Sequence, residues 1–175
     1  GGLPIKFRRA DGEVEHAPPR AVVTGKLGRS KGIATNHFRF LHSVTGRTPK
    51  QCIPSPSMVH FRGGRAGVDK TAYPDMDEFF ADLARVYREE IAELAEIGCR
   101  YLQLDEVNFA FLCDPKLREG VRRLGEDPDE LPHTYARLIN DTIRGRPDDM
   151  VTCMHLCRGN HRSSWVAEGG YEPVA

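Results

Sequence analysis

A histidine and a cysteine stand two positions apart in the segment Met154-His155-Leu156-Cys157. On an extended backbone, residues two apart point to the same side and lie about 6.6 Å apart along the strand, at roughly 3.3 Å per residue. Zinc prefers nitrogen and sulfur ligands, so His155 and Cys157 are candidate metal ligands. The alternative interpretation is a buried thiol beside a hydrogen-bonded histidine.

Two adjacent carboxylates, Asp105 and Glu106, follow the apolar segment Tyr101-Leu102-Gln103-Leu104. Both are candidate substrate-binding residues. Neighbouring residues on a strand point to opposite faces of a sheet, so we expect one carboxylate to meet a ligand and the other to pair with an arginine or cap a helix. An ordinary ion pair is the alternative for either residue.

A third polar stretch, residues 54–65, is predicted as a glycine-bearing loop after a strand and contains Gly63, Gly64 and Arg65. These residues could contact an anion, but the glycine spacings of dinucleotide-binding and P-loop motifs are absent, so the stretch does not predict a nucleotide site. The sequence also lacks the Gly-x-Ser-x-Gly motif of serine hydrolases. No catalytic acid, base or nucleophile is therefore assigned.

The elements that would position these residues alternate along the chain. Strands are predicted over residues 21–24, 51–53, 101–104 and 150–155, and helices over 36–44, from Asp75 to Gly98, from Asp114-Pro115, and over 131–143. Residues 1–20 are expected to form an irregular lead-in. Strands separated by helices predict an α/β fold with a parallel sheet, whose ligands bind at the carboxyl ends of the strands. All three polar stretches follow predicted strands.

Length and composition limit the class of protein. With 175 residues the chain fits one domain, whereas a (β/α)₈ barrel typically needs about 250. The chain is therefore either a small open sheet or part of a larger barrel. A net charge of zero argues against a nucleic-acid binder. Five scattered cysteines, no apolar run long enough for a membrane span and no visible secretory leader favour a reducing, cytoplasmic location without membrane contact.

The strand segment ending in Asp105-Glu106, followed one βα unit later by residues 154–160, resembles the catalytic half of the cobalamin-independent methionine synthases. The similarity is greatest to the short, single-barrel methionine synthase II-like proteins. Their Pro-Ser-Pro-Ser-Met and Phe-Arg-Gly-Gly-Arg stretches resemble residues 54–58 and 61–65, and the resemblance runs from about Val22 to the end of the chain.

This resemblance implies a (β/α)₈ TIM-type barrel in which zinc activates a substrate thiol for methyl transfer. His155 and Cys157 match the first two zinc ligands of the family. Asp105 matches the acid that holds the amino group of homocysteine. Ser57 and Phe61 lie in the loop that faces the methyl-tetrahydrofolate-type donor, although the larger enzymes carry an indole where Phe61 stands.

The family's third zinc ligand, a glutamate, has no matching position, because Glu168 and Glu172 lie too close to Cys157. Its fourth ligand, a cysteine, has no matching position either. We therefore expect residues 1–175 to form a partial catalytic domain that supplies about the middle half of a barrel. This piece alone is not expected to be sufficient for activity. Two alternatives remain open. One is zinc-dependent alkyl transfer to a coenzyme-M-like thiol or from another donor. The other is a non-catalytic barrel fragment that associates through its open sheet edges, for example as a homo-oligomer.

Overall fold

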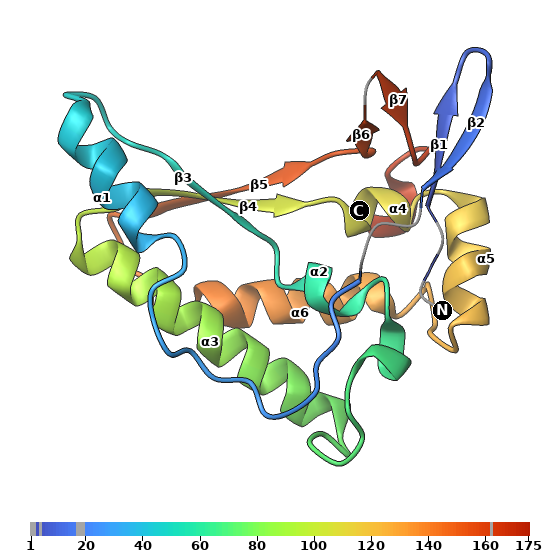
Figure 1. Ribbon diagram of the computed structural model, residues 1–175, viewed down its shortest axis with the longest axis horizontal. Coiled ribbons are helices and arrows are strands. Elements are labelled where there is room, and N and C mark those ends of the chain that lie inside the picture. Colours follow the sequence, from blue (N-terminus) through green and yellow to red (C-terminus); the bar gives the residue numbers. More distant parts are fainter. Residues whose placement is uncertain (1–2, 4, 17–19, 162) are drawn as a thin grey trace.

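The computed structural model describes residues 3, 5–16, 20–161 and 163–175. Its centre is a three-stranded parallel sheet in the order β3 (Gln51–Pro54), β4 (Tyr101–Glu106) and β5 (Val151–Leu156). Helices α3 (Met76–Glu96) and α6 (Leu131–Ile143) cover one face of this sheet (Figure 1). The predicted α/β class with a parallel sheet is confirmed.

The pattern of burial in β4 shows which side of the sheet faces the helices. Leu102, Leu104 and Glu106 are buried, whereas the residues between them are partly exposed. Leu102 and Leu104 pack with Ile91 and Leu94 of α3 in one apolar cluster. The alternate residues of the three strands lie on the uncovered side of the sheet, called the open face below: Cys52, Gln103, Asp105, Cys153 and His155.

The long helix α3 begins and ends at the residues that the sequence indicates. Asp75 is its N-cap, and the Asp75 carboxylate accepts a hydrogen bond from the backbone N–H of Asp77 at 2.9 Å. Gly98 follows the helix with φ +95°, a left-handed conformation that favours glycine. Helix α5 (Pro115–Arg123) likewise begins after the predicted cap, Asp114.

Helix α1 (Thr35–Val44) precedes β3 and leans against α3. The buried carboxylate of Glu90, on α3, accepts hydrogen bonds from the backbone N–H groups of Ile33 and Ala34 at the start of α1. Arg29 forms an ion pair with the same carboxylate at 2.8 Å. These contacts hold the N-terminus of α1 in place, although its N-cap residue, Ala34, provides no side-chain hydrogen bond.

The N-terminal segment differs from the expected irregular lead-in. Strands β1 (Ile5–Arg9) and β2 (Gly12–His16) form an antiparallel hairpin. The hairpin joins β7 (Ser164–Trp165) and β6 (Asn160–His161) in a second sheet of order β2-β1-β7-β6 (Figure 1). The alternation of apolar and charged residues in 5–9 is typical of a strand. The prediction of an irregular segment gave more weight to the nearby prolines.

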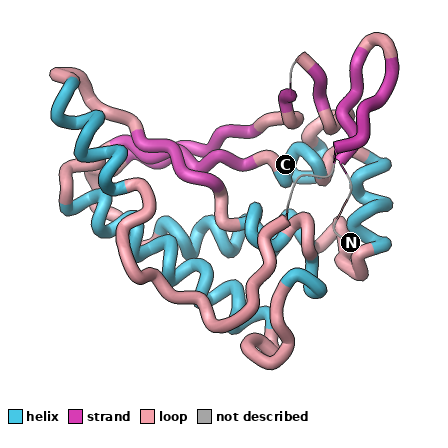
Figure 2. Tube along the Cα trace, viewed as in Figure 1, coloured by secondary structure: helices cyan, strands magenta, loops and turns pink. Residues whose placement is uncertain are grey.

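Two other segments depart from prediction. The strand expected at 21–24 is reduced to a single bridge between Val23 and Val68. The stretch 54–65, expected as a loop, folds into the one-turn helix α2 (Ser57–His60) and enters a 3-10 helix over Gly64–Gly67 (Figure 2). The short helices α4 (Asn108–Phe111) and, near the C-terminus, the 3-10 turn Glu172–Val174 complete the described elements.

The parallel sheet stays open over the described residues. Strand β5 lies at its edge, and the exposed fractions of Val151, Met154 and Leu156 are 61%, 44% and 40%. The resemblance implies a (β/α)₈ barrel of which this chain is expected to supply about the middle half. The described residues form three parallel strands and no closed barrel. No described helix is long and apolar enough to cross a membrane.

Candidate functional site

A pocket of about 600 Å³ lies at the carboxyl ends of β4 and β5. The hairpin strand β1 contributes apolar lining through Ile5 and Phe7. The polar lining comes from the strand ends, from the segment after α2 and from the start of α4: Arg62, Gln103, Asp105, Asn108, His155, Cys157 and Asn160. This is the edge of a parallel α/β sheet at which ligands bind.

The structure brings the two predicted zinc ligands to this one pocket. His155 is the fifth residue of β5 and pairs in register with Asp105, while Cys157 follows the strand end. The backbone N–H of Gly159 donates to the Cys157 sulfur at 3.4 Å. This hydrogen bond orients the Cys157 sulfur at the pocket.

The turn after Cys157 requires a glycine. Gly159 has φ +77°, and a Cβ placed there would lie 2.9 Å from a Val166 methyl carbon and 3.1 Å from the Phe111 ring. Glycine therefore allows the backbone to pass close enough to donate its N–H to Cys157.

The donor set of His155 and Cys157 fits zinc in chemical type but supplies two of the four ligands that zinc takes. Across residues 3, 5–16, 20–161 and 163–175, no group of three or more His, Cys, Asp or Glu side chains is arranged to hold a metal ion. A metal held by this chain would thus need donors from a substrate or from other segments.

Asp105 lines the pocket from the open face, and the amide of Gln103 donates to its carboxylate at 2.5 Å. Glu106 points to the opposite face and is fully buried, so the predicted divergence of the two carboxylates is observed. Asp105 is therefore placed to meet a ligand, whereas Glu106 is not among the residues that line this pocket.

Glu106 instead belongs to a buried polar network beneath the pocket. The Ser57 hydroxyl donates to one Glu106 carboxylate oxygen, and the backbone N–H of Asn108 donates to the other. The Asn108 side-chain amide donates to the Ser57 oxygen at 2.7 Å and to the Met58 sulfur at 3.5 Å. The network joins α2, β4 and α4, and its members Asn108 and Met58 reach the pocket wall.

The buried carboxylate also affects Tyr87 on α3. Burial, followed by the negative charge of Glu106, raises the pKa of the Tyr87 phenol. The neutral hydroxyl of Tyr87 donates to the Pro54 carbonyl oxygen at 2.9 Å, which ties the end of β3 to α3.

Phe61, a predicted substrate-binding residue, lies in the apolar core. Its exposed fraction is 1%, and its ring centroid is 5.9 Å from that of Phe111 and 6.5 Å from that of Tyr135. The next residue, Arg62, lines the pocket instead. Neither Ser57 nor Phe61 is among the lining residues, and the roles predicted for them stay predictions.

Helix α2 is held in place by a buried histidine. The Nδ1 atom of His60 lies 2.9 Å from the Tyr135 hydroxyl, and its Nε2 atom lies 3.6 Å from a Glu126 carboxylate oxygen. The hydrogen bond with His60, with further contributions from the charge of His60 and from Arg65, lowers the pKa of Glu126. This anchoring fixes α2, from which Met58 reaches the pocket, and the start of the turn that carries Arg62.

Sequence reasoning missed Met58, Arg62, Gln103 and Asn108 as pocket residues. A signal existed for Gln103, which shares the alternation of β4 with Asp105. Met58 lies on α2 and Arg62 in the turn that follows it, and the loop expected over residues 54–65 gave no signal for the position of either side chain.

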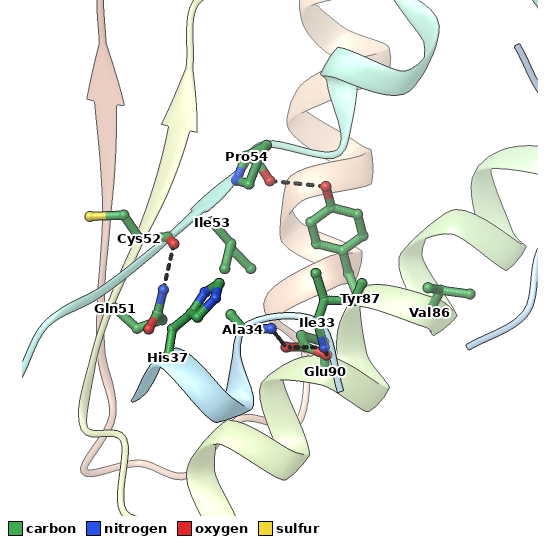
Figure 3. Close-up of a pocket in the computed structure, with 10 residues that line it drawn as sticks. All are labelled: Ile33, Ala34, His37, Gln51, Cys52, Ile53, Pro54, Val86, Tyr87 and Glu90. Carbon is green, nitrogen blue, oxygen red and sulfur yellow. Dashed lines mark hydrogen bonds between the residues drawn. The ribbon is translucent and has the colours of Figure 1, made fainter. Parts of the chain in front are cut away.

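A smaller pocket of about 210 Å³ lies between α1, β3 and α3 (Figure 3). Two of its polar groups are already engaged: the Glu90 carboxylate accepts hydrogen bonds from backbone N–H groups, and the Tyr87 hydroxyl donates to the Pro54 carbonyl oxygen. The Cys52 side chain points away from the other residues in Figure 3. Burial, followed by the charge of Asp105, raises the pKa of the Cys52 thiol, which disfavours the reactive thiolate there.

Comparison with known proteins gives relatives over most of the chain. No family model matches. Two uncharacterized proteins of Bacillus subtilis (strain 168), YxjH and YxjG, are 47% and 42% identical to the chain over 154 and 155 residues, which is 87% of this chain in both cases. The chain spans 40% of the length of each.

Solved structures show the same fold. The crystal structure of a "putative vitamin-B12 independent methionine synthase" from Listeria monocytogenes is 37% identical, with a TM-score of 0.67 over 78% of this chain and 40% of that one. A B12-independent methionine synthase from Shewanella sp. W3-18-1, in complex with selenomethionine, has a TM-score of 0.58 at 22% identity, over 91% of this chain and 39% of that one. In sequence and in fold, this chain resembles a segment of the cobalamin-independent methionine synthase family, as its motifs predict.

Proposed function

We propose that this chain forms part of the catalytic domain of a methyltransferase of the methionine synthase type. The proposed reaction transfers a methyl group from a methyl-tetrahydrofolate-type donor to the thiol of homocysteine, which gives methionine. The observation that carries the proposal is the meeting of Asp105, His155 and Cys157 on one pocket at the carboxyl ends of neighbouring strands.

In this proposal, His155 and Cys157 hold a zinc ion through one nitrogen and one sulfur donor. A free thiol has a pKa of about 8.5 and is mostly protonated at neutral pH. Zinc coordination would supply the thiolate form of a bound substrate thiol. The position of Cys157 in the pocket beside His155 supports the ligand role, and the N–H bond from Gly159 orients the Cys157 sulfur.

Asp105 would bind the ammonium group of the amino acid. The hydrogen bond from Gln103 fixes the orientation of its carboxylate, so that a substrate binds to a group already in place. The apolar lining from Ile5 and Phe7 would exclude water from the reacting sulfur.

The test is zinc binding by the purified chain, measured by elemental analysis and by titration. We expect Cys157→Ser to weaken zinc binding by on the order of tenfold or more, because a thiolate donor is lost. Cys52→Ser is the matched control, since Cys52 is also a free cysteine but lies outside the pocket. Equal zinc binding by wild type and both variants would remove the ligand assignment. Methyl transfer from methyl-tetrahydrofolate to homocysteine would then be measured on the zinc-loaded protein, with a coenzyme-M-like thiol as the competing acceptor.

A further inference from the structure

Arg62 and Asp105 both line the pocket at the strand ends. We propose that Arg62 is a specificity-determining residue that binds a carboxylate of the substrate. Two sources of this carboxylate exist in the proposed reaction, the amino-acid acceptor and the glutamate portion of a folate donor. The inference rests on the proposed function, because it assumes that one of these molecules occupies the pocket.

The backbone that carries Arg62 is fixed on both sides. Phe61, immediately before it, is buried between Phe111 and Tyr135. The carbonyl oxygen of Arg62 itself accepts a hydrogen bond from the backbone N–H of Leu3 at 2.9 Å. A guanidinium on a fixed backbone loses less conformational freedom when it binds a ligand.

The electrostatic surroundings of Arg62 favour an incoming anion. The side chain is half-buried, and burial lowers the pKa of its guanidinium because the charge is partly removed from water. A carboxylate can accept two parallel N–H···O bonds from a guanidinium, a geometry that an ammonium group does not match.

A second arginine of the same Phe-Arg-Gly-Gly-Arg stretch shows the contrast. Arg65 lies three residues later, and its guanidinium donates to the carbonyl oxygens of Val68 and Tyr73 at 2.9 and 2.7 Å. It is not among the residues that line the pocket. Arg65 therefore stabilises the turn of the backbone, whereas Arg62 is one of the residues that line the pocket.

The charges of the residues that line the pocket favour a carboxylate over a phosphate group. Arg62 and Asp105 together bring one positive and one negative group, and the pocket also contains His155. A phosphate group, with nearly two negative charges, would meet repulsion from Asp105. A carboxylate on a ligand that also carries a positive or neutral group fits both charged side chains.

The test compares ligands with and without the carboxylate-bearing portion, measured by isothermal titration calorimetry on the whole chain. One pair is L-methionine and 3-(methylthio)propylamine, and the other is tetrahydrofolate and 6-methyltetrahydropterin. For at least one pair, we expect wild type to bind the carboxylate-bearing member about tenfold or more tightly. Arg62→Gln should reduce that preference to about twofold or less, and Arg62→Lys should retain part of it.

Arg47→Gln is the matched control, because it removes the same charge from an exposed loop and should leave the preference unchanged. Thermal unfolding monitored by circular dichroism checks that each variant is folded. Loss of preference within the amino-acid pair identifies the acceptor as the source of the carboxylate, and loss within the pterin pair identifies the donor. Undiminished preference in folded Arg62→Gln for both pairs overturns the inference alone, and the zinc test of Cys157 then still stands. Failure of wild type to bind any of the four ligands overturns the inference and the proposed function together.

Discussion

The buried network of Ser57, Glu106 and Asn108 provides a quantitative test of how the pocket is supported. Ser57→Ala removes a hydroxyl that donates to Glu106 and accepts from the Asn108 amide at 2.7 Å. All three residues have exposed fractions of 1% or less, so water has little access to the groups left behind. The substitution changes no charge and leaves the surrounding apolar core untouched.

The expected cost follows from the two groups that lose their partner. An unsatisfied buried polar group costs about 1–3 kcal/mol, and more if it is charged. The Asn108 amide keeps its contact with the Met58 sulfur, so its share lies near the lower limit. We therefore expect Ser57→Ala to lower the free energy of unfolding by about 3 kcal/mol, which corresponds to roughly 6–12 °C in Tm for a chain of this size.

Urea denaturation followed by far-ultraviolet circular dichroism measures this change. The control is Ser43→Ala on α1, because Ser43 is exposed and its hydroxyl donates to the Phe40 carbonyl oxygen at 2.8 Å. That variant should remain within about 0.5 kcal/mol of wild type. The double variant Ser57→Ala/Glu106→Gln should differ from the sum of the single variants by about 0.5 kcal/mol or more, since the two side chains share a hydrogen bond.

A loss of less than about 1 kcal/mol in Ser57→Ala would refute the reasoning, because the cost of two unsatisfied buried groups cannot be that small. Strict additivity with Glu106→Gln would show that Glu106 is stabilised by its backbone contacts alone. In either case the network would not be the support that holds Asn108 and Met58 against the pocket.

Three further predictions concern the site and its anchor. Gly159→Ala should lower the free energy of unfolding by about 1 kcal/mol or more, because alanine is strained at φ +77° and its Cβ would lie 2.9 Å from a valine methyl carbon. The control is Gly46→Ala, whose Cβ would have nothing within 4 Å, and its free energy of unfolding should fall by less than about 0.5 kcal/mol in the same urea titration. Asp105→Asn should weaken binding of an amino-thiol far more than binding of zinc in calorimetry, and an unchanged affinity for the thiol would make Asp105 structural. The lowered pKa of Glu126, caused first by its hydrogen bond with His60, means that its contribution to stability is fully present above the ordinary carboxyl pKa of about 4.3 and is lost as the pH falls through the folded-state value. Wild type should therefore lose stability more steeply than Glu126→Gln below about pH 4.5, and parallel pH profiles would contradict this assignment.

Local patterns in the sequence were sufficient for the elements beneath the pocket. The three- and four-residue spacing of apolar residues predicted α3, and Asp75 and Asp114 predicted where α3 and α5 begin. The alternation of β4 predicted that Asp105 and Glu106 face opposite ways. These features depend on interactions within a few residues, such as caps and the periodicity of a helix or strand, and neighbours along the chain carry that information.

The composition of the pocket depended on contacts between distant segments. The hairpin of β1 and β2 forms its sheet with β7, more than 150 residues later, and only this pairing places Phe7 at the pocket. The stretch after β3 folds into α2 because His60 and Ser57 find buried partners on α6 and β4. Neither partner could be identified from local sequence.

By itself, the sequence determined the α/β class, the position of the candidate site at the strand ends, and the pairing of His155 with Cys157 on one side of the chain. The tertiary structure decided which side chains share the pocket. It placed Phe61 and Glu106 in the interior and brought Arg62 and Asn108 to the wall. The physical reason is that burial and hydrogen bonding of a side chain are set by the segments packed against it, and those segments are far away in the sequence.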